Sequence, residues 1–317
     1  MSQLKKNKVI IGSRGSELAL WQANYVKKEL EKKYKNLQAV IKIVHTKGDK
    51  VLDVALSKIG DKSLFTKELE AALLEGKIDL AVHSLKDLQT ELPLGLKLVA
   101  VTKRHNPGDV LIGRKKGNTI KNLREGATVA TGSLRRKCQL MHLRPDINVV
   151  DLRGNVSTRI NKFLDSDWDA IILARAGVER LKLQKHISSY INTDLILPAV
   201  GQGALGIEIN KKNSHIEKLL KPIHDENTYA AVMAERSLLR TLEGGCQVPI
   251  GAYALASPTG LYLDALVGSL DGKITFRKIL RGSKKDPEIL GKTLAKDLLK
   301  AGAKTILQEI YNTSRNL

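Results

Sequence analysis

The sequence predicts an α/β fold of two alternating units, followed by a smaller α+β unit. Three observations predict it. Short apolar runs alternate with helix-like segments over the first two thirds of the chain, which is typical of sheets covered by helices. Three strand-like runs then follow one another, with a helix before them and another after Pro287. With 317 residues, the chain is long enough for two or three hydrophobic cores.

The first unit begins at the first apolar run. Its strands are expected at 8–13, 39–46, 78–84 and 96–103. Segment 16–34 has apolar residues at a helical spacing with Ser16 as its N-cap, and segment 64–76 is predicted as a helix closed by Gly76. Residues 47–62 carry glycine near both ends and charges of both signs, which is typical of a mobile loop such as a lid.

The second unit repeats the alternation. Its strands are expected at 109–113, 128–131, 147–152 and 169–174, and its helices at 133–143, 155–165 and 177–183. The glycine-rich stretch 198–209 ends in a strand that could carry the chain back to the first unit. In the C-terminal unit, a helix at 226–243 precedes strands at 248–256, 260–268 and 273–280. The alternation predicts parallel sheets, and such sheets bind ligands at the carboxyl ends of their strands.

The charge balance is strongly basic, with 53 basic against 33 acidic residues and a net charge of +20. Such a balance raises the possibility of nucleic-acid binding. Aromatic residues make up only 4% of the chain, however, so there is little material for base stacking. Many lysines lie on predicted helix faces as solvated surface, so nucleic-acid binding rests on net charge alone. No apolar run approaches the roughly 20 residues that span a bilayer.

The arginines are distributed differently from the lysines. The segment from residue 135 to residue 180 contains two lysines and seven arginines, namely Arg135, Arg136, Arg144, Arg153, Arg159, Arg175 and Arg180. A guanidinium group can bind a carboxylate or phosphate through two parallel hydrogen bonds, whereas an ammonium group offers a point charge. This local change favours a site for an oxyanion ligand rich in carboxylates.

Charged residues also follow a predicted strand in "AVHSLKDLQ" (81–89). His83, Ser84, Lys86 and Asp87 stand near its carboxyl end, where α/β proteins form their sites. The alternative is a solvated turn with an ordinary lysine–aspartate pair.

Three strand-to-helix turns carry arginine or serine. In "ATGSLRRKCQL" (130–140), Ser133 can cap a helix whose first turn carries Arg135 and Arg136. Free N–H groups and two guanidinium groups would then converge on one anion. "VDLRGNVSTR" and "IGSRGSELALWQ" repeat the arrangement with Arg153, Arg159, Ser13, Arg14 and Ser16. Arginines on solvated helix faces are the alternative for each turn alone, but the three together favour an extended polyanion.

Two cysteines in a chain with no recognisable signal peptide are expected to be free thiols in the cytosol. Cys138 lies inside a predicted helix and is expected to be a buried hydrophobe. Cys246 lies in "LEGGCQVPIG" (242–251), where two glycines leave room for a bulky group. No histidine forms a protease pattern with it, and no zinc-ligand spacing occurs. Cys246 is therefore either a small buried side chain or a point of covalent attachment.

Together these stretches resemble the porphobilinogen deaminase, or hydroxymethylbilane synthase, family. The similarity runs in order through "SRGSELALWQ", "HSLKDL", "GSLRRKCQL", "LRGNVSTR", "AIILARAGVERL", "PAVGQGALGIE" and "ERSLLRTLEGGCQVPIG". It therefore covers nearly the whole chain, and the last motif resembles the family's cofactor-attachment signature throughout. The resemblance implies two domains similar to periplasmic binding proteins and a third, α+β domain that holds the cysteine. The implied boundaries are 1–102 with 203–221, then 103–202, then 222–317.

The resemblance also implies roles for individual residues. Cys246 would hold a dipyrromethane cofactor through a thioether, Asp87 would be the catalytic aspartate, and no metal is expected. The positions implied to bind acetate and propionate groups of cofactor and substrate are Arg14, Ser16, Lys86, Ser133, Arg135, Arg136, Arg153, Arg159 and, in the hinge-side motif, Gln202. Residues 47–62 match the family's mobile loop over the active site. The family usually has proline where this chain has Gln89.

The implied reaction is stepwise. Porphobilinogen loses ammonia to give a methylene-pyrrolenine cation. The free α-carbon of the terminal pyrrole attacks this cation and then loses its proton. Four such rounds, followed by hydrolysis, would release a linear tetrapyrrole from a monomeric enzyme. The alternative from another class is a two-lobed anion-binding protein without turnover, which would need neither Cys246 nor Asp87.

Overall fold

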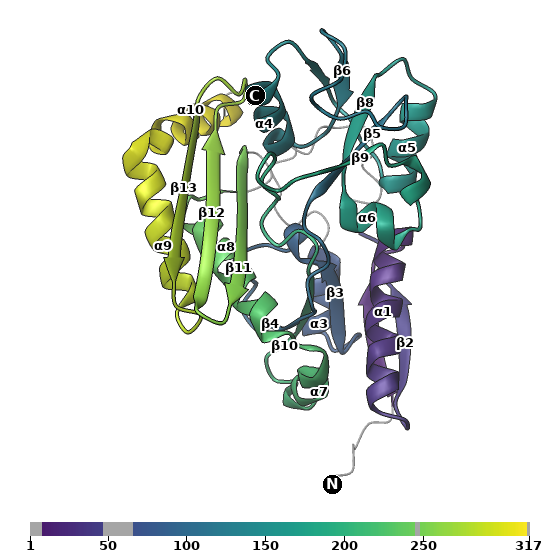
Figure 1. Cartoon of the computed structure of the whole chain (residues 1–317). Helices are drawn as coiled ribbons and strands as arrows, with labels where there is room; N and C mark the ends of the chain where they lie inside the picture. The colour runs from purple at the N-terminus through teal and green to yellow at the C-terminus, as the bar shows by residue number, and fades with distance from the viewer. Residues whose placement is uncertain (1–7, 47–65, 245–247, 316–317) are drawn as a thin grey trace. The chain divides into compact units, whose positions relative to one another are not determined.

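A computed structural model of the chain describes residues 8–46, 66–244 and 248–315 (Figure 1). Contacts between Cα atoms divide the chain into two units. The described residues of unit 1 fall within Met1–Val51, Ser63–Arg104 and Ala204–Tyr229, and those of unit 2 within His105–Gly203 and Ala230–Leu317. The three-domain boundaries implied by the resemblance stay a prediction.

Unit 1 contains a five-stranded sheet in the order β2-β1-β3-β10-β4. Its strands are β1 (Lys8–Ser13), β2 (Gln38–Ile43), β3 (Leu80–Ser84), β4 (Leu96–Val101) and β10 (Leu205–Asn210). Its helices are α1 (Glu17–Lys33), α3 (Lys67–Leu74) and α7 (Ser214–Leu220). The core includes fully buried Val9 and Ile11 of β1 packed with Val26 and Leu30 of α1. The predicted return of the chain through residues 198–209 is confirmed, because β10 lies between β3 and β4.

Unit 2 contains a second five-stranded sheet in the order β7-β6-β8-β5-β9. Its strands are β5 (Asp109–Gly113), β6 (Thr128–Ala130), β7 (Asn148–Val150), β8 (Ala170–Ala174) and β9 (Ser189–Ile191). Its helices are α4 (Leu134–Leu143), α5 (Val156–Leu164) and α6 (Arg175–Arg180). Apolar clusters lie on both faces of this sheet, as its alternation of strands and helices predicts.

The prediction of parallel sheets holds for β1 with β2 and β3 and for β6 with β7 and β8, but not for the rest of either sheet. β10 runs antiparallel to β3 and β4, and β5 runs antiparallel to β8 and β9. Parallel neighbours require a crossover that returns the chain to the same end of the sheet. β10 instead enters its sheet after the chain has passed through unit 2, so its direction is set by that long excursion.

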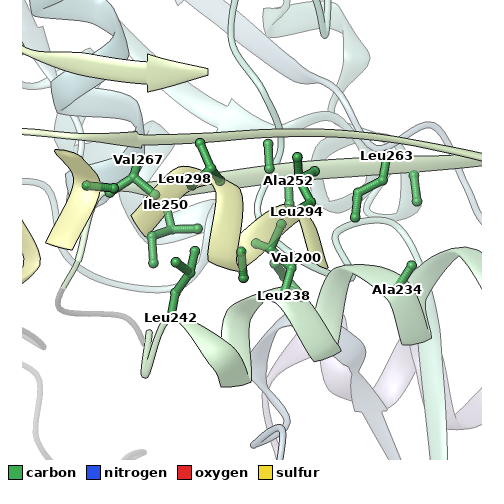
Figure 2. Packing of buried hydrophobic residues seen from close by; sticks show 14 of the residues in the cluster. Val200, Ala234, Leu238, Leu242, Ile250, Ala252, Leu263, Val267, Leu294 and Leu298 are labelled. Atoms are coloured by element: carbon green, nitrogen blue, oxygen red, sulfur yellow. The ribbon is translucent and has the colours of Figure 1, made fainter. Parts of the chain in front are cut away.

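The C-terminal part of unit 2 is a three-stranded antiparallel sheet packed against helices (Figure 1). It consists of β11 (Ile250–Ser257), β12 (Gly260–Gly268), β13 (Thr275–Gly282), α9 (Pro287–Leu298), α10 (Lys304–Arg315) and the part of α8 (Glu226–Thr241) that follows Tyr229. Figure 2 shows Leu238 of α8 and Leu294 of α9 in one cluster with Ala252 and Leu263 of the sheet. The expected α+β unit, and with it the α/β fold class, is confirmed.

Some local features differ from the expectation. The strand β9 has only three residues and was not predicted, because it is too short for a periodic signal. The helix expected after Pro287 is interrupted at Gly302, whose φ of 121° is outside the helical range. A helix at 177–183 was expected, but α6 begins at Arg175 and ends before Lys182, whose φ is 59°. Over the described ranges, no helix has the length and apolar character needed to cross a membrane.

Candidate functional site

In unit 1, two predicted site segments lie at one edge of the sheet. β1 and β3 are parallel neighbours, so their carboxyl ends meet at the same edge. β1 leads into Arg14 and β3 leads into Lys86 and Asp87. Both Arg14 and Lys86 are half-buried.

Asp87 lies between two buried leucines that anchor the turn and leave its carboxylate exposed. Leu85 and Leu88 are 1% and 4% exposed, whereas Asp87 between them is exposed. The turn is a 3₁₀ helix, η2 (Leu85–Asp87), whose first N–H donates to the carbonyl of Ala204 at 3.0 Å. Among the residues that the structure describes, none hydrogen-bonds or pairs with the side chain of Asp87. The sequence therefore fixes the backbone of this turn and leaves its carboxylate available.

Helix α1 supports the same edge. Ser16 is its N-cap, and its side chain accepts a hydrogen bond from the N–H of Ala19 at 3.4 Å, as predicted. Gln22, one turn further and buried, donates from Nε2 to Oγ of Ser84 at 2.6 Å. This bond joins the first turns of α1 to the end of β3.

His83 does not extend toward this edge as the sequence suggested. It lies within β3, is 6% exposed, and its Nε2 is 3.0 Å from Oε2 of the buried Glu208 on β10. Histidine and glutamate face each other because β3 and β10 are paired, Gly206 being opposite His83 in the register. His83 is therefore a partner in a buried polar pair rather than a member of the exposed turn.

In unit 2, the turn between β6 and α4 forms as predicted. Ser133 is the N-cap of α4, and its Oγ accepts from the N–H of Arg136 at 3.4 Å. Gly132 allows the close approach of the next segment, because a Cβ there would lie 2.5 Å from the carbonyl oxygen of Leu152. Arg135 and Arg136 follow in the first turn, but both are at least 95% buried.

The two guanidinium groups converge on a carboxylate of the chain itself. Arg136 binds Asp109 with two hydrogen bonds, Nε to Oδ2 at 3.0 Å and Nη2 to Oδ1 at 2.8 Å. Arg135 donates from Nη2 to Oδ2 of the same residue at 2.9 Å. Gln202, also buried, donates to Oδ1 at 2.9 Å. Three residues that the sequence assigned to ligand binding are thus brought together around Asp109.

The surroundings keep Asp109 ionised. Burial alone would raise the pKa of its carboxyl group, but the charges of Arg135 and Arg136 and the hydrogen bonds from Arg136 and Gln202 hold that pKa far below its ordinary value. Burial lowers the pKa of Arg135, and the charge of Asp109 opposes this effect. The cluster of Asp109, Arg135 and Arg136 therefore contains two guanidinium charges and one carboxylate charge.

The third predicted turn supplies Arg153 and Arg159. Gly154, with a φ of 118°, turns the chain, and Asn155 caps α5 by accepting from the N–H of Thr158 at 2.8 Å. Arg159 donates from Nε to the carbonyl of Gly154 at 2.7 Å. Arg153 is half-buried and has no hydrogen bond or salt bridge to any residue in the described ranges. Burial lowers the pKa of Arg153, while the charge of Asp151 opposes the shift.

The remaining arginines of this segment bind other groups of the protein. The local excess of arginine therefore predicted more ligand-binding residues than the structure supports. Arg144 donates to the carbonyls of Ile120 and Leu123 and pairs with Asp146 at 2.6 Å. Arg175 pairs with Glu179 and lies over the ring of Tyr190. Arg180 donates to the carbonyl of Gly203 at 2.9 Å.

Two predicted features fall outside the described residues. These are the attachment cysteine, Cys246, and the loop at 47–62. Cys138 is described and is fully buried against Gly268, so its expected role as a buried hydrophobe is confirmed.

Cys138 is expected to be inert toward thiol reagents. Burial raises the pKa of its thiol to about 12, and the charge of Asp271 adds to the shift. A Cys246→Ala chain should therefore react with an aromatic disulfide reagent at pH 8 only after unfolding in denaturant, when one thiol per chain becomes available. Absorbance of the released thiolate measures the reaction. Rapid labelling of the native variant would contradict the packing of Cys138.

The sequence analysis did not identify the buried residues that bind the predicted site residues. Asp109, Gln22 and Glu208 each hold a predicted residue or its neighbour in place. The available signal was weak, namely a charged side chain at the first position of the apolar strand 109–113 and another inside the apolar run at 205–210. A buried carboxylate in such a strand requires a partner. Within the parts of the chain described here, no group of three or more His, Cys, Asp or Glu side chains is arranged to hold a metal ion.

Two family models and several curated relatives that match this chain carry the same family name. A family model described as "Porphobilinogen deaminase, dipyromethane cofactor binding domain" matches residues 9–218, and one for the porphobilinogen deaminase C-terminal domain matches residues 229–300. The porphobilinogen deaminase of Carboxydothermus hydrogenoformans is 51% identical over 305 residues, covering 96% of this chain and 98% of the relative. That of Chloroherpeton thalassium is 50% identical over 309 residues, with 96% and 98% covered. Among solved structures, the methionine binding protein MetQ matches with a TM-score of 0.44 and 14% identity, covering 70% of this chain and 92% of MetQ.

Proposed function

Because the chain belongs to the porphobilinogen deaminase family, it is a transferase of tetrapyrrole biosynthesis, and we propose that Asp87 is its catalytic carboxylate and that its arginines bind the acidic side chains of substrate and cofactor. The enzyme deaminates porphobilinogen, joins four units head to tail on a dipyrromethane primer, and releases the linear tetrapyrrole hydroxymethylbilane. The alternative of an anion-binding protein without turnover is not favoured, because the family match extends over nearly the full chain.

Asp87 is the catalytic residue of this proposal. Loss of ammonia from porphobilinogen leaves a methylene-pyrrolenine cation, and a nearby carboxylate stabilises that charge and can accept hydrogen bonds from pyrrole N–H groups. The observation that carries the proposal is the exposed Asp87 carboxylate, which no described side chain neutralises and which two buried leucines hold in place. Arg14 and Lys86 lie at the same sheet edge and supply positive charge for substrate carboxylates.

The acetate and propionate groups of substrate and cofactor are bound by Arg135, Arg136, Arg153 and Arg159, together with Ser16 and Ser133. Gln202 contributes through the hydrogen bond that it donates to Asp109. Arg153 supports this role because it makes no hydrogen bond or salt bridge within the described ranges, and only the charge of Asp151 acts on it. The Asp109 cluster supports it because it contains more guanidinium than carboxylate charge. Positive charge that is half-buried or buried and only partly compensated is costly, so an acidic ligand would stabilise both places.

The donor set fits a dipyrromethane cofactor, which brings two carboxylates on each ring. When bound, that group supplies the terminal pyrrole carbon on which the chain is extended. Cys246 holds it through a thioether and takes no further part in turnover. Porphobilinogen is the small-molecule substrate. We place the reaction in the cytoplasm and expect a monomer that does not require nucleic acid.

The intact mass of the purified protein tests the attachment. Protein produced in cells that make porphobilinogen should carry the additional mass of two linked pyrroles, because the thioether survives denaturation. The Cys246→Ala chain should show the bare sequence mass. The matched control, Cys138→Ala, should keep the additional mass, since Cys138 is buried in the core. A wild-type protein of bare mass would count against the attachment.

A further inference from the structure

Asp109 occupies a special position among the carboxylates of unit 2. It is the first residue of β5, is 1% exposed, and lies between strands β8 and β9. Each of its two oxygens accepts two hydrogen bonds: Oδ1 from Arg136 and Gln202, and Oδ2 from Arg135 and Arg136. An ionised carboxylate offers about four acceptor sites, so its capacity is used entirely by the residues already assigned to ligand binding.

These bonds fix the orientation of the donors. Arg136 has the two-pronged geometry on Asp109 and also donates from Nη1 to the carbonyl of Ile172 at 3.1 Å. Arg135 is held on its other side by the carbonyl of Leu197 at 2.6 Å. Gln202 donates from the same Nε2 to the carbonyl of Pro107 at 2.6 Å. Two long side chains with many rotamers are thereby restrained at the first turn of α4.

The negative charge of Asp109 also affects the electrostatics of the two arginines. With one carboxylate between two guanidinium groups, mutual repulsion of the arginines is relieved, yet one positive charge remains uncompensated within the cluster. The Nε of Arg135 is buried without a hydrogen-bond partner, which is consistent with donor capacity that Asp109 does not use. An aspartate at this place therefore both aligns the pair and leaves it cationic.

We propose that Asp109 is a positioning residue for carboxylate recognition: it orients Arg135 and Arg136 toward the acidic side chains of the pyrrole rings without itself contacting them, and the hydrogen bond from Gln202 helps to hold it in place. This inference rests on the proposed function of those two arginines. The ring carboxylates keep their charge throughout the reaction, so their recognition is the same in the ground state and the transition state. A defect in this recognition raises KM and leaves kcat nearly unchanged.

The test compares Asp109→Asn with Asp264→Asn. Asp264 is a matched control because it is 3% exposed and forms the same two-pronged pair, with Arg277, at 3.0 and 2.7 Å in the C-terminal sheet. Both variants lose a buried charge and should lose thermal stability. Only Asp109→Asn should raise the KM for porphobilinogen, by about 10- to 100-fold, with kcat within about threefold of wild type, as expected when a binding group is misplaced. An equal KM in the two variants would overturn the proposal.

A second variant decides the question if Asp109→Asn does not fold. Asp109→Glu keeps the charge that pairs with the arginines but displaces them by one methylene group. It should melt closer to wild type than Asp109→Asn and still show a raised KM, whereas a wild-type KM would overturn the positioning role. Failure of the proposed function itself would appear separately, as absence of porphobilinogen turnover in the wild-type enzyme and in Asp264→Asn.

Discussion

The Asp87→Asn variant is expected to retain the covalent pyrrole mass on Cys246 and to lose about 10³-fold in kcat. The amide keeps the size of the carboxylate and one acceptor oxygen, but it removes the negative charge that stabilises the cation formed on loss of ammonia. KM should change much less, since the substrate's acidic side chains bind elsewhere. The measurements are the rate of tetrapyrrole formation and the intact mass of the protein.

A conformational explanation for this loss can be separated from a chemical one. Asp87 is exposed and its side chain has no partner in the described structure, so its replacement should change the free energy of unfolding only by the amount usual for a surface substitution, about 0.5 kcal/mol. Glu91→Gln is the matched control, because it removes an exposed carboxylate four residues further along the same segment. It should keep full activity. Full activity in Asp87→Asn would remove Asp87 from the mechanism.

Local signals in the sequence predict most of the elements but not how they join. The strands at β1, β5 and β8 and the caps of α1 and α4 follow from apolar period and from serine at the helix start, which depend only on neighbouring residues. The antiparallel directions of β5 and β10 depend on the whole intervening path of the chain. No local pattern records that path.

The candidate site shows the same division. Sequence reasoning placed Asp87 and the arginines at strand ends and helix starts, and the structure has them there. It could not distinguish Arg144, which caps backbone carbonyls, from Arg153, which has no such partner in the described ranges. The two have similar local surroundings, and their different roles come from segments distant in the sequence. The Asp109–Arg136 pair, separated by 27 positions, was missed for this reason.

The arginines of unit 2 therefore differ in what they can give a ligand. Arg144 and Arg175 use their charge on neighbouring acids and contribute to the stability of the fold. Arg135 and Arg136 share one internal carboxylate and keep one charge in excess. Arg153 is half-buried and forms no salt bridge in the described ranges; burial disfavours its cation, and the charge of Asp151 opposes that effect only in part. Among these arginines, Arg153 is the one at which a ligand carboxylate has the least competition from protein carboxylates.

The Arg153→Glu variant is accordingly expected to lose about 100-fold in kcat/KM for porphobilinogen, mainly through KM. The substitution removes a charge-assisted contact and adds repulsion toward every acidic side chain of the growing product. Initial rates over a range of substrate concentrations separate KM from kcat. Raising the ionic strength should increase the wild-type KM by screening the attraction, and it should increase the KM of the variant by a smaller factor, because the repulsion at position 153 is screened as well.

An effect of Arg153→Glu on substrate binding can be separated from an effect on stability, because Arg153 has no ion pair to break among the described residues. Its thermal midpoint should stay close to that of wild type, in contrast to Asp109→Asn. The control is Arg281→Glu, which reverses an exposed arginine on β13 and changes the net charge by the same amount. If both reversals raised KM equally, the effect would come from the overall positive charge of +20 rather than from a site at Arg153. Selective loss in Arg153→Glu is the result expected when one guanidinium group binds the acidic side chains directly.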